Sequence, residues 1–238
     1  MPKASGGNPA RPLLVSSTVS RTRNAAFFLA AVALLALVGC SGGQKQTADN
    51  PGGAIIRTPA GDPNGLRGAT LDRPYSLPAA TLTDTSGNQF NLVTSTKKPV
   101  TLVFFGYTNC PDVCPTVMAD VASALTKLDE SVRSQVQLLF ITTDPARDTG
   151  PVIRKYLDRF DPSFVGLTGS LASIKDIAKA VGVPVEGMKK LPSGGYEVGH
   201  GAQVLGFGAN DKATVLWLSN AAIGDLAHDF GKLVEENQ

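Results

Sequence analysis

A nearly unbroken apolar run, Val100–Tyr107, restricts the architectures open to this chain. Its length and its β-branched and aromatic residues are typical of a strand that is buried on both faces, as in a parallel sheet. A second run of this kind covers 136–142, and segments with helical spacing of apolar residues follow both runs. Because strands alternate with helices, the sequence predicts an α/β protein.

The remaining segments extend this pattern at both ends. The sheet is predicted to be mixed, because strands that alternate with helices pair in parallel and a late hairpin adds an antiparallel edge. A central mixed sheet flanked by helices, with an added N-terminal hairpin, corresponds to a thioredoxin-like fold. The predicted helices cover 116–128, 151–160, 171–181 after a Ser170 cap, and a last segment capped by Asn220. The other predicted strands form a hairpin over 81–92 and cover 164–167, 202–207 and 213–218. A Gly- and Pro-rich stretch covers 182–195.

Composition excludes several functional classes. The chain has 238 residues and a net charge of +2, and residues 1–39 contain four basic residues and no acidic one, which leaves −2 for the rest. Without a basic surface, the protein is not expected to bind nucleic acid. Its three cysteines are too few for a disulfide scaffold or for a zinc site made of cysteines alone.

Residues 1–39 are predicted to be a signal peptide. Arg21 and Arg23 precede an uncharged apolar run, 25–38, which suits a signal sequence and is short for a membrane span. The run ends in small residues before Cys40, which resembles the lipobox of bacterial lipoproteins. In those proteins the cysteine is lipidated and becomes the first residue of the mature chain. The alternatives are an ordinary signal peptide or an uncleaved anchor.

The segment from 40 to 66 is rich in Gly, Pro, Asn, Asp and Thr, and we interpret it as a flexible tether behind the lipidated cysteine. The folded domain is then expected to cover 67–238, which is long enough for one hydrophobic core. Acyl chains on Cys40 would anchor this domain at the extracytoplasmic face of the bacterial cell membrane.

Two cysteines, Cys110 and Cys114, follow the first buried strand. Because Pro111 and Pro115 are tolerated only at or before a first helical turn, we expect the pair on a loop that leads into a helix. On such a loop the two sulfurs can form a disulfide or bind one soft metal ion, and the helix N-terminus favours the thiolate. A purely structural disulfide is the alternative in an exported protein.

Residues 105–116, which contain both cysteines, resemble the signature of the Sco/SenC family. These membrane-tethered, thioredoxin-like proteins help to metallate the dinuclear copper centre of cytochrome c oxidase. Residues 144–149 resemble the second signature of the family, and His200 corresponds to its late histidine. The resemblance covers about 74–230 and implies a copper-binding domain, here in a bacterial lipoprotein form.

The resemblance implies that Cys110, Cys114 and His200 bind copper. Thiolates favour Cu(I), whereas imidazole accepts either Cu(I) or Cu(II). Asp144 and Asp148 would lie behind these ligands, where they bond the cysteine loop or orient His200; alternatively, they belong to an ordinary helix N-terminal turn. The other histidine, His228, is expected in solvent on the last helix, and Met118 and Met188 in core or loop positions rather than on the metal.

Two functions remain open. The first is a monomeric copper chaperone that delivers copper to cytochrome c oxidase subunit II. The second is a thiol-disulfide oxidoreductase that uses Cys110 and Cys114 to keep oxidase cysteines reduced. Against general redox catalysis, three residues separate the cysteines, where thioredoxins have two. A peroxidase would need a single reactive cysteine, so the paired layout disfavours it.

We expect Cys40 to carry acyl chains in protein extracted from bacterial membranes, because a lipobox directs lipidation of the cysteine that ends it. Peptide mass spectrometry of the wild type and of a Cys40→Ala variant checks this. The added mass should be found on Cys40 of the wild type and should be absent from the variant. An unmodified Cys40 in the wild type would contradict the lipoprotein prediction.

Overall fold

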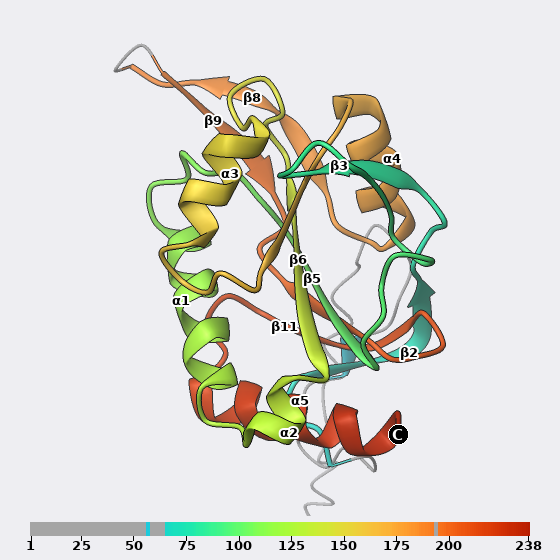
Figure 1. Ribbon diagram of the computed structural model, residues 1–238. Coiled ribbons are helices and arrows are strands. Elements are labelled where there is room, and N and C mark those ends of the chain that lie inside the picture. The colour runs from blue at the N-terminus through green and yellow to red at the C-terminus, as the bar shows by residue number, and fades with distance from the viewer. Residues whose placement is uncertain (1–55, 58–64, 193–194) are drawn as a thin grey trace, which may run out of the picture. The chain divides into compact units, whose positions relative to one another are not determined.

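The computed structural model describes residues 56–57, 65–192 and 195–238 (Figure 1). The predicted signal peptide and Cys40 lie outside these residues. The strands are β1 (Ile56–Arg57), β2 (Ala69–Ser76), β3 (Thr81–Asp84), β4 (Gln89–Asn91), β5 (Val100–Gly106), β6 (Val136–Thr142), β7 (Val165–Thr168), β8 (Val185–Lys190), β9 (Tyr196–His200), β10 (Val204–Phe207) and β11 (Lys212–Trp217). The helices are α1 (Val113–Leu125), α2 (Glu130–Arg133), α3 (Gly150–Leu157), α4 (Leu171–Ala180) and α5 (Ile223–Glu236).

Two sheets are present in the described part of the chain. One has nine strands in the order β1-β2-β11-β10-β5-β6-β7-β3-β4, and the other consists of β8 and β9. Strands β5, β6 and β7 are parallel, while β10, β11, β2 and β3 pair in antiparallel fashion with their neighbours. The prediction of a mixed central sheet is therefore confirmed.

Strand β5 lies inside the sheet, and all of its residues are buried. Its side chains alternate between two hydrophobic clusters, because successive residues of a strand point to opposite faces. Phe104 belongs to the cluster on one face and Phe105 to the cluster on the other. This two-sided burial explains why the strand is apolar along its whole length, as predicted.

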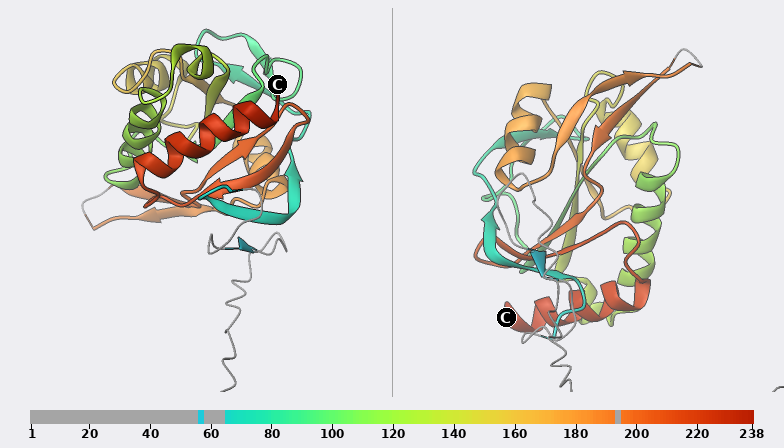
Figure 2. Two further views of the ribbon diagram at one scale, coloured as in Figure 1. Left: turned by 90° about the horizontal axis from the view of Figure 1, so that it is seen from below. Right: turned by 180° about the vertical axis from the view of Figure 1, so that it is seen from behind.

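Helices cover both faces of the sheet. Side chains from α1, α3 and α5 pack into the cluster that contains Phe104, and side chains from α4 pack into the cluster that contains Phe105. Figure 2 shows α5 beside α1 on one face, and Figure 1 shows α4 on the opposite side. The described part of the domain therefore has three layers, with the sheet between two layers of helix.

The late hairpin, β10–β11, is not at the edge of the sheet as predicted. Strand β2 pairs with β11, and β1 pairs with β2. The sequence of β2 does not indicate a strand, because three consecutive residues, 72–74, are exposed and only part of one face is apolar. Leu66 is buried in the core, so the packed chain begins before Arg67, within the segment expected to be a tether.

Two helix starts and one strand also differ from prediction. Helix α1 begins at Val113 rather than at 116, and α5 begins after Ala222 rather than Asn220. The stretch over 182–195 contains β8, which is exposed and charged and therefore lacks a strand pattern. By contrast, Ser170 caps α4 as predicted, because its hydroxyl accepts a hydrogen bond from the Ser173 N–H at 3.0 Å.

Among the described residues, no helix is both long and apolar enough to cross a bilayer.

Candidate metal site

Cys110, Cys114 and His200 come together from three elements: the loop after β5, the first turn of α1 and the end of β9. Two sulfurs and one imidazole nitrogen lie within 4.8 Å of one another. Cys114 Sγ is 3.4 Å from His200 Nε2. Both cysteines are free thiols, with Cys110 half-buried and Cys114 buried. No other group of three His, Cys, Asp or Glu side chains in the described chain is arranged to hold a metal ion.

The cysteine pair is not wholly on a loop, because Cys114 belongs to the first turn of α1. Backbone N–H groups in a first turn have no partner within the helix. The N–H of Cys114 donates to Cys110 Sγ at 3.3 Å, whereas the N-cap residue Asp112 makes no side-chain capping bond. The Cys110 sulfur therefore takes the place of a capping oxygen, and Pro115 fits here because it has no N–H to satisfy.

Gly106, the last residue of β5, leaves room for the buried sulfur. A Cβ atom added to Gly106 would lie 3.2 Å from Cys114 Sγ and 2.6 Å from the Phe104 ring. The absence of a side chain at the end of the strand therefore lets α1 bring its cysteine close to the sheet.

His200 is oriented before any metal binds. It is the last residue of β9, not part of a loop as predicted. Its Nδ1 lies 2.9 Å from the Gly201 carbonyl oxygen, which can only accept a hydrogen bond, so Nδ1 carries the proton. Nε2 then presents its lone pair to Cys114, as a metal-ligating histidine must. The rings of Phe104 and Tyr107 contact the imidazole edge to face, with centroid distances of 6.2 Å and 5.7 Å.

The two thiols have opposite acidities. Hydrogen bonds from the Cys114 thiol and from the Cys114 N–H lower the pKa of the Cys110 thiol to about 3, although its partial burial opposes this. The pKa of Cys114 is raised, because its proton is held between the sulfurs and the side chain is buried. In the reduced protein Cys110 is therefore the thiolate, and a metal ion that bound both sulfurs would have to displace the proton of Cys114.

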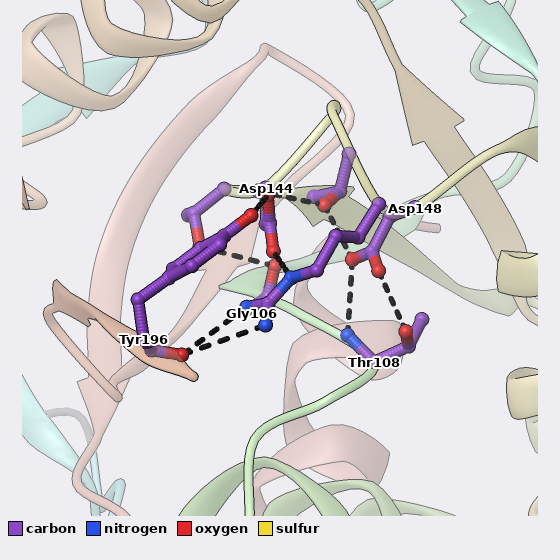
Figure 3. Close-up of polar contacts among 8 residues, drawn as sticks. Gly106, Thr108, Asp144, Asp148 and Tyr196 are labelled. Carbon is purple, nitrogen blue, oxygen red and sulfur yellow. Dashed lines mark hydrogen bonds and ion pairs between the residues drawn. The ribbon is translucent and has the colours of Figure 1, made fainter. Parts of the chain in front are cut away.

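Asp148 supports the cysteine loop from behind (Figure 3). Its buried carboxylate accepts hydrogen bonds from the backbone N–H of Thr108 at 2.9 Å, from the Thr108 hydroxyl at 2.6 Å and from the Thr142 hydroxyl at 2.6 Å. Thr108 precedes Cys110 by two residues, so Asp148 ties the loop to the end of β6. It does not cap α3, whose N-cap residue is Thr149.

Asp144 makes different contacts. Its carboxylate pairs with Arg147 and accepts a hydrogen bond from the Tyr196 hydroxyl at 2.9 Å. Asp144 thus contacts the strand that carries His200 rather than the cysteine loop. Tyr196 is not predicted as a site residue from sequence, although its spacing of four residues from His200 places both on one face of a strand.

The other candidate side chains do not belong to the cluster of Cys110, Cys114 and His200. Met118 is buried in the core, as predicted, and Met188 is 62% exposed on β8. His228 is exposed on α5, as predicted, and its Nδ1 is 2.9 Å from the buried carboxylate of Asp229.

Comparison with known proteins identifies the family of this chain. The family model described as SCO1/SenC matches residues 70–235. The chain belongs to the SCO1/SenC family. A SCO1/SenC relative, Protein sco1 of Schizosaccharomyces pombe, is 42% identical over 113 residues, which cover 47% of this chain and 42% of that protein. The chain spans 63% or less of the length of the first curated relatives that it matches.

Solved structures of Sco proteins share the fold. Bradyrhizobium japonicum ScoI with copper bound is 28% identical, with a TM-score of 0.58 and coverage of 70% of this chain and 98% of that chain. Apo Sco1 from Thermus thermophilus is 29% identical, with a TM-score of 0.59 and coverage of 73% and 95%. These similarities confirm the predicted thioredoxin-like fold and the Sco/SenC resemblance.

The acidity of Cys110 predicts an unusual pH profile for its alkylation. For a thiol with a pKa near 8.5, the fraction present as thiolate falls about tenfold for each pH unit below that value. Cys110 stays ionised far below neutral pH, so its rate constant with iodoacetamide should be nearly constant between about pH 8 and about pH 6. Peptide mass spectrometry assigns the reacting residue.

A Cys114→Ala variant is the matched comparison, because it removes the thiol that lowers the Cys110 pKa most. Its Cys110 should react more slowly as the pH falls. A tenfold loss of rate per pH unit in the wild type would show that Cys110 is an ordinary thiol.

Proposed function

We propose that this protein binds copper at Cys110, Cys114 and His200 and acts as a membrane-tethered chaperone for the dinuclear copper centre of cytochrome c oxidase. The observation that carries the proposal is the donor set: two sulfurs and one nitrogen lone pair within 4.8 Å of one another. Thiolate sulfur is the preferred ligand of Cu(I), and the imidazole allows the same site to hold Cu(II).

The cluster fits a three-coordinate ion with small movements. Ligands spaced evenly at about 2.0–2.3 Å from an ion lie roughly 3.5–4 Å from one another. Cys114 Sγ and His200 Nε2 are 3.4 Å apart, and the cluster as a whole spans no more than 4.8 Å. Structural zinc almost always takes four protein ligands. Within the described residues, the cluster offers three, which favours copper.

Relatives support copper as the cargo. The B. japonicum ScoI structure, which is 28% identical to this chain, has copper bound. A yeast Sco1 structure with copper bound is 29% identical, with a TM-score of 0.57 and coverage of 68% of this chain and 86% of that chain. The proposed link to oxidase assembly rests on the family resemblance. In this proposal the protein is a monomer, and subunit II of the oxidase receives the copper.

The exposure of the ligands suits transfer by ligand exchange. Cys110 and His200 line a pocket of about 250 Å³ that also contains Tyr107 and Val113, whereas Cys114 is buried behind them. A ligand from the partner can enter this pocket and bind the open side of a three-coordinate ion. Cys110, as the accessible ligand, would then be exchanged before Cys114.

Tethering follows from the N-terminal sequence. A lipidated Cys40 would hold the domain at the extracytoplasmic face of the membrane. The tether, 40–66, would give the copper site some reach while it remains close to a membrane-bound oxidase.

A second candidate function is favoured by the unequal acidities of the thiols. The Cys110 thiolate could attack one sulfur of a substrate disulfide and release the other as a thiolate. Cys114 would lose its proton and attack the Cys110 sulfur, which forms the Cys110–Cys114 disulfide and releases the second substrate thiolate. The substrate gains two electrons and the cysteine pair loses two. Oxidase cysteines awaiting metal would be the substrates.

His200 separates the two functions. In reduced, anaerobic protein, His200→Ala should weaken copper binding at least about tenfold, which equals about 1.4 kcal/mol, and more for Cu(II) than for Cu(I). The rate of disulfide reduction should change little, because exchange depends on sulfur acidity and access. Copper titration and a disulfide-reduction assay on the same samples measure both.

His228→Ala is the matched control, because it removes the other histidine of the chain and should leave both activities intact. Unchanged copper affinity in His200→Ala would remove His200 from the site. Loss of both activities would mean that His200 supports the fold of the site instead of binding metal.

Delivery has its own test. Copper-loaded protein mixed with a metal-free soluble domain of oxidase subunit II should produce the visible absorption of the dinuclear centre. A loaded Cys110→Ala variant should deliver more slowly or not at all, because it lacks the accessible ligand. Formation of the centre at the same rate from free copper and from loaded wild type would contradict a chaperone role.

A further inference from the structure

We propose that Tyr196 is a positioning residue for the copper site, held by Asp144 and Arg147, and that this contact keeps His200 against the cysteines. We refer to Asp144, Arg147 and Tyr196 together as the Tyr196 clamp. The inference rests on the proposed function, because it concerns the strength with which the same site retains copper. It assigns a role to side chains that bind no metal themselves.

The hairpin that carries His200 is attached weakly to the rest of the domain. Strands β8 and β9 form a sheet of their own, with no strand pairing to the nine-stranded sheet. All of β8 after Val185 is exposed. Figure 1 shows the hairpin projecting beyond the helices at one end of the domain. Its placement therefore depends on Val185 at its base and on side chains of β9.

One face of β9 makes these contacts. Tyr196, Val198 and His200 share a face, because side chains of a strand alternate. Val198 is buried in the core. The strand rises about 3.3 Å per residue, so Tyr196 and His200 are separated by roughly 13 Å. Fixing the Tyr196 end limits how far the His200 end can tilt.

The clamp holds Tyr196 in three ways (Figure 3). The Tyr196 hydroxyl donates to Asp144 Oδ1 at 2.9 Å. The guanidinium carbon of Arg147 lies 3.7 Å from the centroid of the Tyr196 ring, a cation–π distance. Both terminal nitrogens of Arg147 are 3.5 Å from the Tyr196 carbonyl oxygen. Arg147 is itself fixed by its ion pair with Asp144, which is buried.

His200 has no comparable anchor of its own. Its Nδ1 bonds Gly201, the next residue of the same chain segment, and that bond would move with the hairpin. The remaining side-chain contacts are the edge-to-face packing on Phe104 and Tyr107 and the 3.4 Å approach to Cys114. The backbone of His200 pairs with Val185 at the base of the same hairpin, so this pairing also moves with the hairpin. The position of Nε2 relative to the sulfurs therefore depends on where the hairpin is held.

The oxidation state of copper determines how much the clamp matters. Cu(II) favours nitrogen ligands more than Cu(I) does, whereas two thiolates suffice to hold Cu(I). Loss of the clamp should therefore weaken Cu(II) binding strongly and Cu(I) binding little. The same asymmetry makes withdrawal of His200 a natural first step in releasing Cu(I) to a partner.

Tyr196→Leu tests the clamp, because it removes the ring and the hydroxyl but leaves the Asp144–Arg147 ion pair. The dissociation constant for Cu(II), measured by titration of the purified full chain, should rise about tenfold. Tyr196→Phe keeps the ring over Arg147 and should show a smaller rise. Lys189→Ala is the matched control on the exposed strand of the hairpin and should bind as the wild type does.

Double variants show whether Tyr196 acts through His200. In a His200→Ala background, Tyr196→Leu should cause no further loss of Cu(II) affinity, because the ligand that it positions is gone. In metal-free protein, hydrogen exchange of the β9 amides should be faster in Tyr196→Leu than in the wild type. Tyr196→Phe should retain most of the wild-type protection.

Two results would overturn the inference. One is wild-type Cu(II) affinity in Tyr196→Leu. The other is an equal loss of affinity with and without His200, which would show general support of the fold. Wild-type protein that binds no copper would instead overturn the proposed function, and the clamp's role in it, so the two failures are distinguishable.

Discussion

The parallel pairing of β5 with β6 determines where the chemistry of this protein can lie. The strands run in register from Val100 opposite Val136 to Gly106 opposite Thr142, so their carboxyl ends reach the same edge of the sheet. The cysteine loop follows the carboxyl end of β5. The segment with Asp144 and Asp148 follows the carboxyl end of β6. Because the strand ends are adjacent, Asp148 reaches the loop directly and Asp144 faces the hairpin.

Sequence predicts the parts of this arrangement that depend on local chemistry. The strands around Phe104 and 136–142 are identified by apolar runs, because two-sided burial leaves no place for a polar face. The position of the cysteine pair near the start of a helix is predicted because prolines limit where a helix can start. Pro115 nevertheless lies inside the first turn of α1, where a missing N–H costs nothing.

The elements that sequence does not predict are those held by distant contacts. Strand β8 is exposed and charged, and it is a strand only because β9 pairs with it. The contact between Tyr196 and Asp144 spans 52 residues, and that between Cys114 and His200 spans 86. Local propensity carries no information about such pairs. From sequence, His200 is therefore indicated only by the family resemblance. Its tautomer is assigned from the structure, by the contact with the Gly201 carbonyl.

The use of the Cys110 sulfur as a helix cap has an electrostatic consequence for the cargo. A Cu(I) ion with two thiolates carries one net negative charge. The positive end of the α1 dipole faces this charge and stabilises it, in the way that helix N-termini stabilise bound anions. The loaded site therefore needs no basic side chain of its own to balance its charge. Removal of an ion bound in this way would have to overcome the attraction of the helix dipole as well as the bonds to the two sulfurs.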